Sequence, residues 1–135
     1  MSFSLPAGHK GSEIQTVAAW HDALNSGDVQ RLVGLSHPDI EVGGPRGTSH
    51  GGQILPEWVD RANVHLEPRR AFSEAGTVVV EQEAEWQSAG PGSRQMVASV
   101  FVVDDGLVTS VVRYPDLATA LRAAGLDESH ERSLG

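Results

Sequence analysis

The chain has 135 residues, of which 39% are hydrophobic, so its length fits a single domain with one core. With 10 basic and 18 acidic residues, a formal net charge of -8 and a pI near 5.1, it lacks the basic footprint of nucleic-acid-binding proteins. No run approaches the roughly 18 apolar residues of a membrane-spanning helix, and no signal peptide is evident. Without cysteine there is no disulfide, thiolate nucleophile or zinc knuckle. We therefore expect a cytoplasmic protein with no nucleic-acid or membrane partner.

The first half of the chain has helical periodicity. After Ser12, a residue type that caps helices, apolar side chains recur at helical spacing up to the turn at Gly27. Asp28 predicts the cap of a second helix, which Pro38 ends. In chain order we expect a flexible tail (1–11), a helix (12–25), a second helix (29–35), a short strand (39–42), a glycine-rich turn (43–47) and a third helix (54–62).

The second half has the alternation of strands. The turn Asp104, Asp105, Gly106 joins two arms that are apolar on both faces, which predicts a central hairpin covered by helices on one face and by a second sheet or subunit on the other. Helices first and strands afterwards favour an α+β fold, a single domain over residues 12–126 with helices on one side of a curved antiparallel sheet. We expect four strands (66–72, 77–87, 96–103 and 107–114), a short last helix (117–124) and a flexible tail (127–135).

Charged and glycine-rich segments give no sign of a metal or a cofactor. Glu81, Glu83 and Glu85 alternate on one face of a predicted strand, which indicates a solvated or subunit-facing stripe. The glycines around Gly43 and Gly51 follow no nucleotide-binding pattern. The six histidines are scattered without the close spacing of metal ligands: His9, His21, His37, His50, His65 and His130. We expect no metal site and no cofactor.

Four stretches recur in an order typical of one superfamily. They are ALNSGDVQRLVGLSHPDIEV, the helix entry at residues 51–58, FVVDDGLVTSVVRYPD and the closing LRAAGL. In this order the chain resembles the NTF2-like superfamily, and within it the SnoaL-like and ketosteroid-isomerase-like proteins. The resemblance implies a cone, in which a bent sheet and three N-terminal helices enclose a pocket and a short C-terminal helix follows. It also implies a small, mostly apolar ligand and often a dimer built on the outer sheet face.

The resemblance does not extend to the catalytic residues of the characterised enzymes. The oxyanion-hole tyrosine, the general-base aspartate and the protonated aspartic acid of the steroid isomerases fall on Trp20, Gly44 and Ser99. Enolisation by that carboxylate mechanism is therefore not expected. The limonene epoxide hydrolases need a carboxylate where Arg113 stands, whereas the SnoaL-like cyclases keep a tyrosine and an aspartate here, as Tyr114 and Asp116 do. That short match assigns no base.

Two ionisable residues are candidates for catalysis. His21 could face the cone as a general base, or be a hydrogen-bonded histidine in a partly buried helix face. Arg113 could hold a carboxylate or a developing oxyanion, or form an ion pair with a glutamate of the acidic stripe.

The residues that we expect to line a ligand site are Trp20, Arg46, His50, Trp58, Gln82, Trp86, Ser99, Phe101 and Tyr114. Their aromatic members could equally be core, and the loop from Arg46 to His50 could equally be a solvated turn.

Two functional hypotheses follow. The first is a cofactor-free protein that binds a small, mostly apolar molecule in its cone; were it an enzyme, it would transfer protons as an isomerase, cyclase or hydrolase, with His21 as base and Arg113 as electrophilic partner. The alternative is a non-catalytic dimerisation or interaction module whose cone is filled by Trp20, Trp58, Trp86 and Phe101. For both, burial of roughly 800 Å² per subunit would cover the apolar outer face in a homodimer. The residues expected on that face are Met96, Ala98, Val100, Val102, Val108 and Val112.

Overall fold

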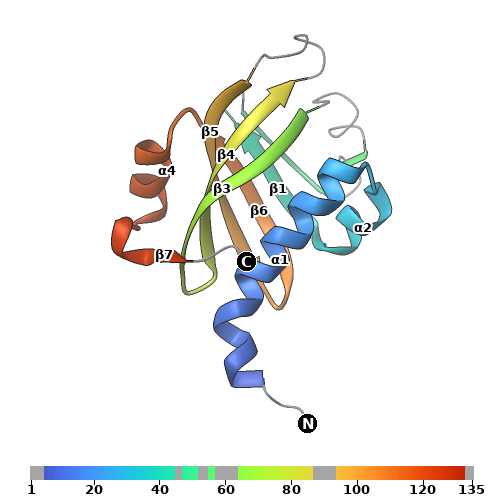
Figure 1. Ribbon diagram of the computed structural model, residues 1–135. Coiled ribbons are helices and arrows are strands. Elements are labelled where there is room, and N and C mark those ends of the chain that lie inside the picture. The colour runs from blue at the N-terminus through green and yellow to red at the C-terminus, as the bar shows by residue number, and fades with distance from the viewer. Residues whose placement is uncertain (1–4, 45–46, 52–54, 57–63, 87–93, 133–135) are drawn as a thin grey trace.

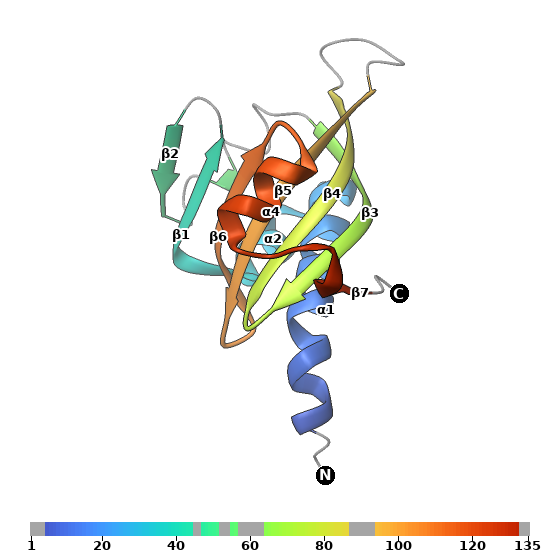
Figure 2. The same cartoon turned by 90° about the vertical axis from the view of Figure 1, so that its left-hand side faces the viewer.

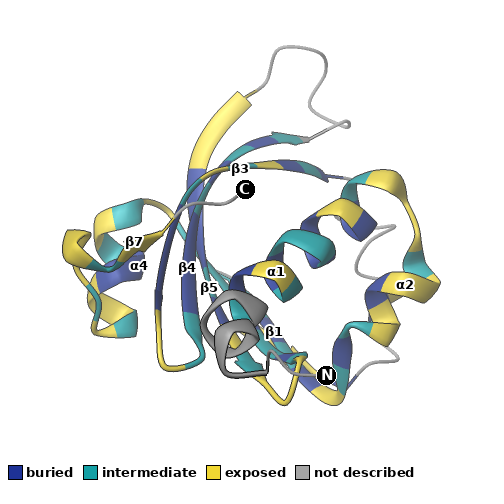
Figure 3. Ribbon diagram, turned by 60° about the horizontal axis from the view of Figure 1, so that its bottom comes forward, coloured by how far each residue is buried: buried dark blue, intermediate teal, exposed yellow. Residues whose placement is uncertain are grey.

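A curved sheet crossed by one long helix forms the body of the protein (Figure 1). The computed structural model describes residues 5–44, 47–51, 55–56, 64–86 and 94–132. Helix α1 (Leu5–Ser26) lies across the concave side of the sheet, and helix α4 (Leu117–Ala124) packs on the opposite side (Figure 3). The predicted α+β cone is confirmed. Of the third helix expected over residues 54–62, only Leu55 and Pro56 are among the described residues, and both are helical.

Within the described residues the sheet has seven strands, in the order β2-β1-β6-β5-β4-β3-β7 (Figure 2). Among the described pairs, β1 runs parallel to β6 and the others are antiparallel, so the sheet is mixed where the sequence predicts an antiparallel one. Periodicity predicts strands but does not report which distant strands pair, and β1 and β6 are far apart in the chain. The strands are β1 (Ser36–Gly44), β2 (Gly47–His50), β3 (Val64–Glu74), β4 (Thr77–Trp86), β5 (Arg94–Asp104), β6 (Leu107–Tyr114) and β7 (Glu131–Arg132).

The inner face of the sheet, which α1 covers, carries the main core. Val78, Val80, Gln82 and Ala84 of β4 are buried there, as the two-residue period of a strand requires. Helix α1 contributes apolar side chains at helical spacing, from Ile14 and Val17 to Leu24. Helix α2 (Val29–Gly34) follows, capped by the side chain of Asp28 as predicted.

The outer face of the sheet is partly covered by α4. Phe72, Val79 and Ala98 are buried there against Ala120 and Leu121 of the helix. The outer apolar surface is therefore smaller than the sequence predicts.

One member of the predicted outer set lies on the other face. A register shift in the β5–β6 hairpin, between Val102 and Val103, brings Val108 into the inner core. Met96 and Val102 remain exposed on the outer face, at 44% and 36%.

Both segments predicted as tails contain regular structure. Helix α1 begins at Leu5 instead of Ser12, and Pro6 falls in its first turn, where a proline costs no helical hydrogen bond. At the other end, a short helix η3 (Glu128–His130) leads into β7, which pairs with β3. The loop expected at His50 is likewise an edge strand, β2.

Arg70 of β3 binds the C-terminal segment to the sheet through hydrogen bonds. Its guanidinium bonds to Glu128 at 3.1 Å and to Glu131 at 3.0 and 3.1 Å. It also lies 5.1 Å from the ring centre of Phe72. A polar sequence that looks disordered is thus ordered by an arginine about sixty residues earlier in the chain.

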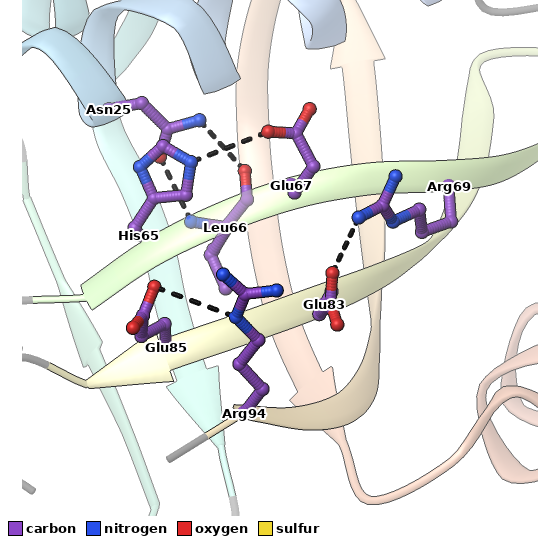
Figure 4. Close-up of polar contacts among 8 residues, drawn as sticks. All are labelled: Asn25, His65, Leu66, Glu67, Arg69, Glu83, Glu85 and Arg94. Atoms are coloured by element: carbon purple, nitrogen blue, oxygen red, sulfur yellow. Dashed lines mark hydrogen bonds and ion pairs between the residues drawn. The ribbon is translucent and has the colours of Figure 1, made fainter. Parts of the chain in front are cut away.

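Polar side chains attach the middle and the end of α1 to strands β3 and β4. In the middle of the helix, Glu13 accepts hydrogen bonds from the Ser73 hydroxyl and the Gly76 backbone at the β3–β4 turn. Near its end, Asn25 donates to the Leu66 carbonyl at 2.8 Å and accepts from the Leu66 amide at 2.9 Å (Figure 4). The Asn25 amide thus pairs with the backbone of β3 as a neighbouring strand would.

Replacement of Asn25 tests this attachment. We expect Asn25→Ala to lower the free energy of unfolding by about 1–3 kcal/mol, because it leaves two partly buried backbone groups of Leu66 without partners. Urea denaturation would measure the loss. Asn25→Asp keeps only the hydrogen-bond acceptor, so its stability should fall between that of the parent chain and that of Asn25→Ala. Replacement of the exposed Ser26 by Ala should change the free energy of unfolding by less than about 0.5 kcal/mol. Equal stability of Asn25→Ala and the parent chain would contradict the assignment.

Candidate functional site

A polar layer crosses the otherwise apolar inner core. Gln82 of β4 interrupts the apolar residues of that strand and points toward α1, where His21 meets it. The Nε2 atoms of Gln82 and His21 are 2.7 Å apart, and the Ser99 hydroxyl of β5 donates to Gln82 Oε1 at 2.9 Å. All three side chains are buried. The structure therefore brings together three residues that the sequence analysis proposed as site residues, and we call them the polar layer.

The backbone carbonyl of Val17 decides the tautomer of His21. His21 Nδ1 lies 2.8 Å from that oxygen, one helical turn earlier. Because a carbonyl oxygen can only accept, Nδ1 carries the hydrogen in the neutral ring, and Nε2 is left with a lone pair that accepts from the Gln82 amide. Both ring nitrogens of His21 are thus engaged within the protein.

Burial keeps His21 neutral. The loss of solvent lowers the pKa of this imidazole to about 4, although the hydrogen bond to Val17 and the charge of Glu67 act in the opposite direction. A general base works best with a pKa near the working pH and with a lone pair open to the substrate. In this arrangement the geometry favours the interpretation of His21 as a hydrogen-bonded core histidine.

Aromatic rings fill the core next to the polar layer. The ring of Phe101 lies 5.4 Å from that of Trp20, edge to face, and 5.3 Å from that of His21. The Trp20 indole N–H donates to the Ser36 hydroxyl at 3.1 Å, and Ser36 in turn donates to the Leu32 carbonyl at 2.8 Å. The polar edge of Trp20 thus bonds to the first residue of β1.

Arg113 lies beside the polar layer on the same face of the sheet. In the β5–β6 pairing it is the direct partner of Ser99. Gly44, near the end of β1, leaves room beside it: a Cβ atom built there would stand 3.9 Å from both Arg113 Cβ and Nη2. The side chain is partly exposed, so a permanently charged guanidinium stands at the border of a buried neutral layer.

The acidic stripe lies on the other face of the sheet. Glu83 pairs with Arg69 at 2.5 Å, and Glu85 with Arg94 at 3.9 Å (Figure 4). The hydrogen bond from Arg69 and its positive charge lower the pKa of Glu83. Register and burial separate Arg113 from this stripe, since the residues between the glutamates belong to the inner core.

Two predicted lining residues lie away from the polar layer. Tyr114 packs into the outer cluster under α4. His50 is exposed on β2, with Nε2 4.0 Å from the Glu41 carboxylate. The aspartate that follows Tyr114 and Pro115 has a structural role, because Asp116 caps α4 by accepting from the Thr119 amide at 2.8 Å, which lowers its pKa.

Some predictions fall outside the described part of the chain. Arg46 and Trp58 lie outside the described residues, and of Trp86 only the backbone, opposite Val64, is described. Within the described residues, no group of three or more histidine, aspartate or glutamate side chains could hold a metal ion. No helix in that part is long and apolar enough to cross a membrane.

Sequence reasoning missed how the site residues are connected. The inward position of Gln82 among valines was a usable signal of a buried polar group. The acceptor at Val17 was not predictable, because it is a backbone carbonyl that every residue possesses.

Comparison with known proteins identifies the family. Residues 17–111 match the model of the SnoaL-like domain, which covers more than half of the chain and confirms the predicted membership. No curated protein matches this chain.

Solved structures share the fold at low identity. TerC, crystallised with polyporic acid, is 21% identical with a TM-score of 0.69, over 83% of this chain and 96% of that one. A Sinorhizobium meliloti protein provisionally named a polyketide cyclase is 19% identical with a TM-score of 0.67, over 73% and 93%. A Catenulispora acidiphila protein with a ketosteroid isomerase-like fold, in complex with trimethylamine, is 22% identical with a TM-score of 0.64, over 83% and 93%. At these identities the likeness establishes the fold alone.

The low pKa of His21 predicts a pH dependence of stability. Between pH 6.5 and about 4 the unfolded chain binds a proton at His21 that the folded chain does not, so stability is complete above pH 6.5 and falls toward pH 4. We expect this residue to account for a loss of about 3 kcal/mol over that interval. Urea unfolding of the parent and of His21→Gln at several pH values isolates the effect, because the carboxylates titrate in both. Parallel pH profiles would show that His21 is not buried in neutral form.

Proposed function

Because this chain belongs to the SnoaL-like domain family, we propose that it binds a small, mostly apolar organic molecule on the inner face of its sheet. The site comprises the polar layer of His21, Gln82 and Ser99, together with Arg113. The observation that carries the proposal is the polar layer itself, buried in a core that is apolar on both sides of it.

Burial of polar side chains in a core costs free energy of desolvation that burial of apolar side chains does not. Apolar side chains of similar volume often serve stability as well as or better than buried polar groups, which must all find partners. Every buried side-chain nitrogen and oxygen of the described residues does have a partner, so the layer is complete and not a packing fault. A complete polar layer next to a charged arginine supplies the few placed polar groups that orient a ligand in an apolar site.

Arg113 suits an acidic or carbonyl oxygen of the ligand. Its planar guanidinium presents several donors and keeps its charge at any working pH. The molecule co-crystallised with TerC, polyporic acid, is named as an acid, which agrees with this role. The ligand class that we propose is therefore an apolar, aromatic or alicyclic, molecule with one acidic or carbonyl oxygen.

Proton transfer would be a separate property of this site. His21 Nε2 could take up a substrate proton only after the Gln82 amide had moved away from it. An isomerase, cyclase or hydrolase reaction with His21 as base and Arg113 as electrophilic partner thus requires the ligand to displace Gln82. Binding alone requires no such change.

The alternative, an interaction module with a filled cone, also has an observation in its favour. Trp20 and Phe101 are completely buried and pack edge to face, so they occupy the inner core beside the polar layer with protein atoms. Ligand screening separates the two hypotheses, because a filled cone predicts no stabilisation by any small molecule.

The ligand hypothesis predicts stabilisation by apolar acids. We expect aromatic carboxylates such as 2-naphthoate to raise the melting temperature, and the neutral amide of the same ring to do so less. Arg113→Met should weaken carboxylate binding by about tenfold to a hundredfold, as expected for loss of a hydrogen bond to a charged group. Calorimetry would measure the affinities, with Arg122→Met on the exposed α4 surface as the matched control. A panel of steroids, aromatic polyketides and carboxylic acids that stabilises nothing would contradict the proposal.

We also propose a homodimer through the outer sheet face. Met96 and Val102 of β5 are exposed large apolar residues there, on the part that α4 leaves uncovered. Light scattering at micromolar concentration should give about twice the chain mass of 14.3 kDa, and the double variant Met96→Lys, Val102→Lys should give the single mass. A single mass for the parent chain would contradict this proposal.

A further inference from the structure

The hydrogen bonds of the polar layer run in one direction. At one end stands the Val17 carbonyl, which can only accept, so His21 donates from Nδ1 and accepts at Nε2. The Gln82 amide must then turn its NH₂ group to His21 and its oxygen to Ser99. The Ser99 hydroxyl gives its hydrogen to that oxygen.

This direction determines what Ser99 can offer to a further partner. A hydroxyl has one hydrogen and two lone pairs, and the hydrogen of Ser99 is committed to Gln82. What remains on the Ser99 oxygen is acceptor capacity. A ligand group that contacts Ser99 without breaking the layer must therefore be a hydrogen-bond donor.

Arg113, the cross-strand neighbour of Ser99, requires a hydrogen-bond acceptor from the ligand. Ser99 and Arg113 are direct cross-strand partners, and such pairs have Cβ atoms about 4.5–5.5 Å apart. A guanidinium only donates, so the ligand group beside it must accept. A ligand that contacts both residues therefore needs a donor for Ser99 and an acceptor for Arg113.

From this polarity we infer that the ligand carries a hydroxyl or amine that donates to Ser99, together with a carboxylate or carbonyl oxygen held by Arg113. The inference rests on the proposed function and narrows it to hydroxylated or aminated apolar acids and ketones. A meta-hydroxybenzoate carries both kinds of group on a flat apolar ring. Conversion of its hydroxyl to a methyl ether removes the donor and leaves the carboxylate unchanged.

The first test concerns the direction of the layer. Nitrogen NMR of the folded protein distinguishes the two neutral tautomers of histidine, and His21→Gln assigns the His21 signal among the six histidines. We expect hydrogen on Nδ1 at pH 7. Hydrogen on Nε2 would reverse the amide of Gln82 and overturn the inference, whatever the ligand.

The second test compares three probes, namely 3-hydroxybenzoate, 3-methoxybenzoate and benzoate. We expect the hydroxyl compound to bind about tenfold to a hundredfold more tightly than the methyl ether, since the ether sets a lone pair against the Ser99 oxygen. Ser99→Ala should abolish this preference, whereas Ser110→Ala, a serine that bonds to Glu41 on the outer face, should keep it. If Ser99→Ala does not fold, Ser99→Thr retains the hydroxyl and should retain the preference.

The outcomes separate the two proposals. Equal binding of the three probes overturns the donor requirement and leaves the ligand site standing. Tighter binding of the methyl ether does the same. Absence of binding by all three probes and by the wider panel of acids overturns the proposed function and this inference together.

Discussion

The attachment of α1 to the concave side of the sheet is the constraint on which the rest of the structure depends. Three polar side chains along one stripe of the helix, Glu13, His21 and Asn25, bond to the β3–β4 turn, the middle of β4 and the backbone of β3. Apolar contacts alone are nondirectional and would tolerate sliding of the helix along the sheet. Hydrogen bonds at three levels permit one register, because any shift leaves buried donors and acceptors unpaired. The position of every inner-face residue relative to the helix follows from that register.

The same attachment sets the chemistry available to His21. As the middle attachment, its ring gives one nitrogen to Val17 and the other to Gln82, and burial lowers its pKa to about 4. General-base catalysis needs the opposite, a lone pair exposed to substrate and a pKa near neutrality. The structural and catalytic roles therefore compete for one nitrogen atom. A ligand that engages the layer through Ser99 avoids this competition, since it leaves the bonds of the histidine intact.

Local signals in the sequence predicted the elements well, and long-range pairings were beyond them. Strand β6 and helix α4 begin and end where predicted, because an Asp-Gly turn precedes the first while Asp116 and Gly125 cap the second. The parallel pairing of β1 with β6, the register shift that turns Val108 inward and the docking of β7 all depend on contacts between distant residues. Alternation assigned Gln82 and Ser99 to the inner face, yet it could not show that they meet His21.

The resemblance to the steroid isomerases implies that Ser99 and Gly44 stand where those enzymes carry an acid and a base. In the structure, the inner face next to Arg113 holds a neutral hydrogen-bonded layer that includes Ser99. While His21 stays bonded to Gln82, the layer neither removes nor supplies a proton at neutral pH. For the ligand that we propose, its direction, fixed at a backbone carbonyl that can only accept, would select donors at Ser99. A directional neutral chain of this kind would give the proposed site selectivity without requiring a reaction. Selectivity of this kind is a property of a binding site whether or not a reaction follows.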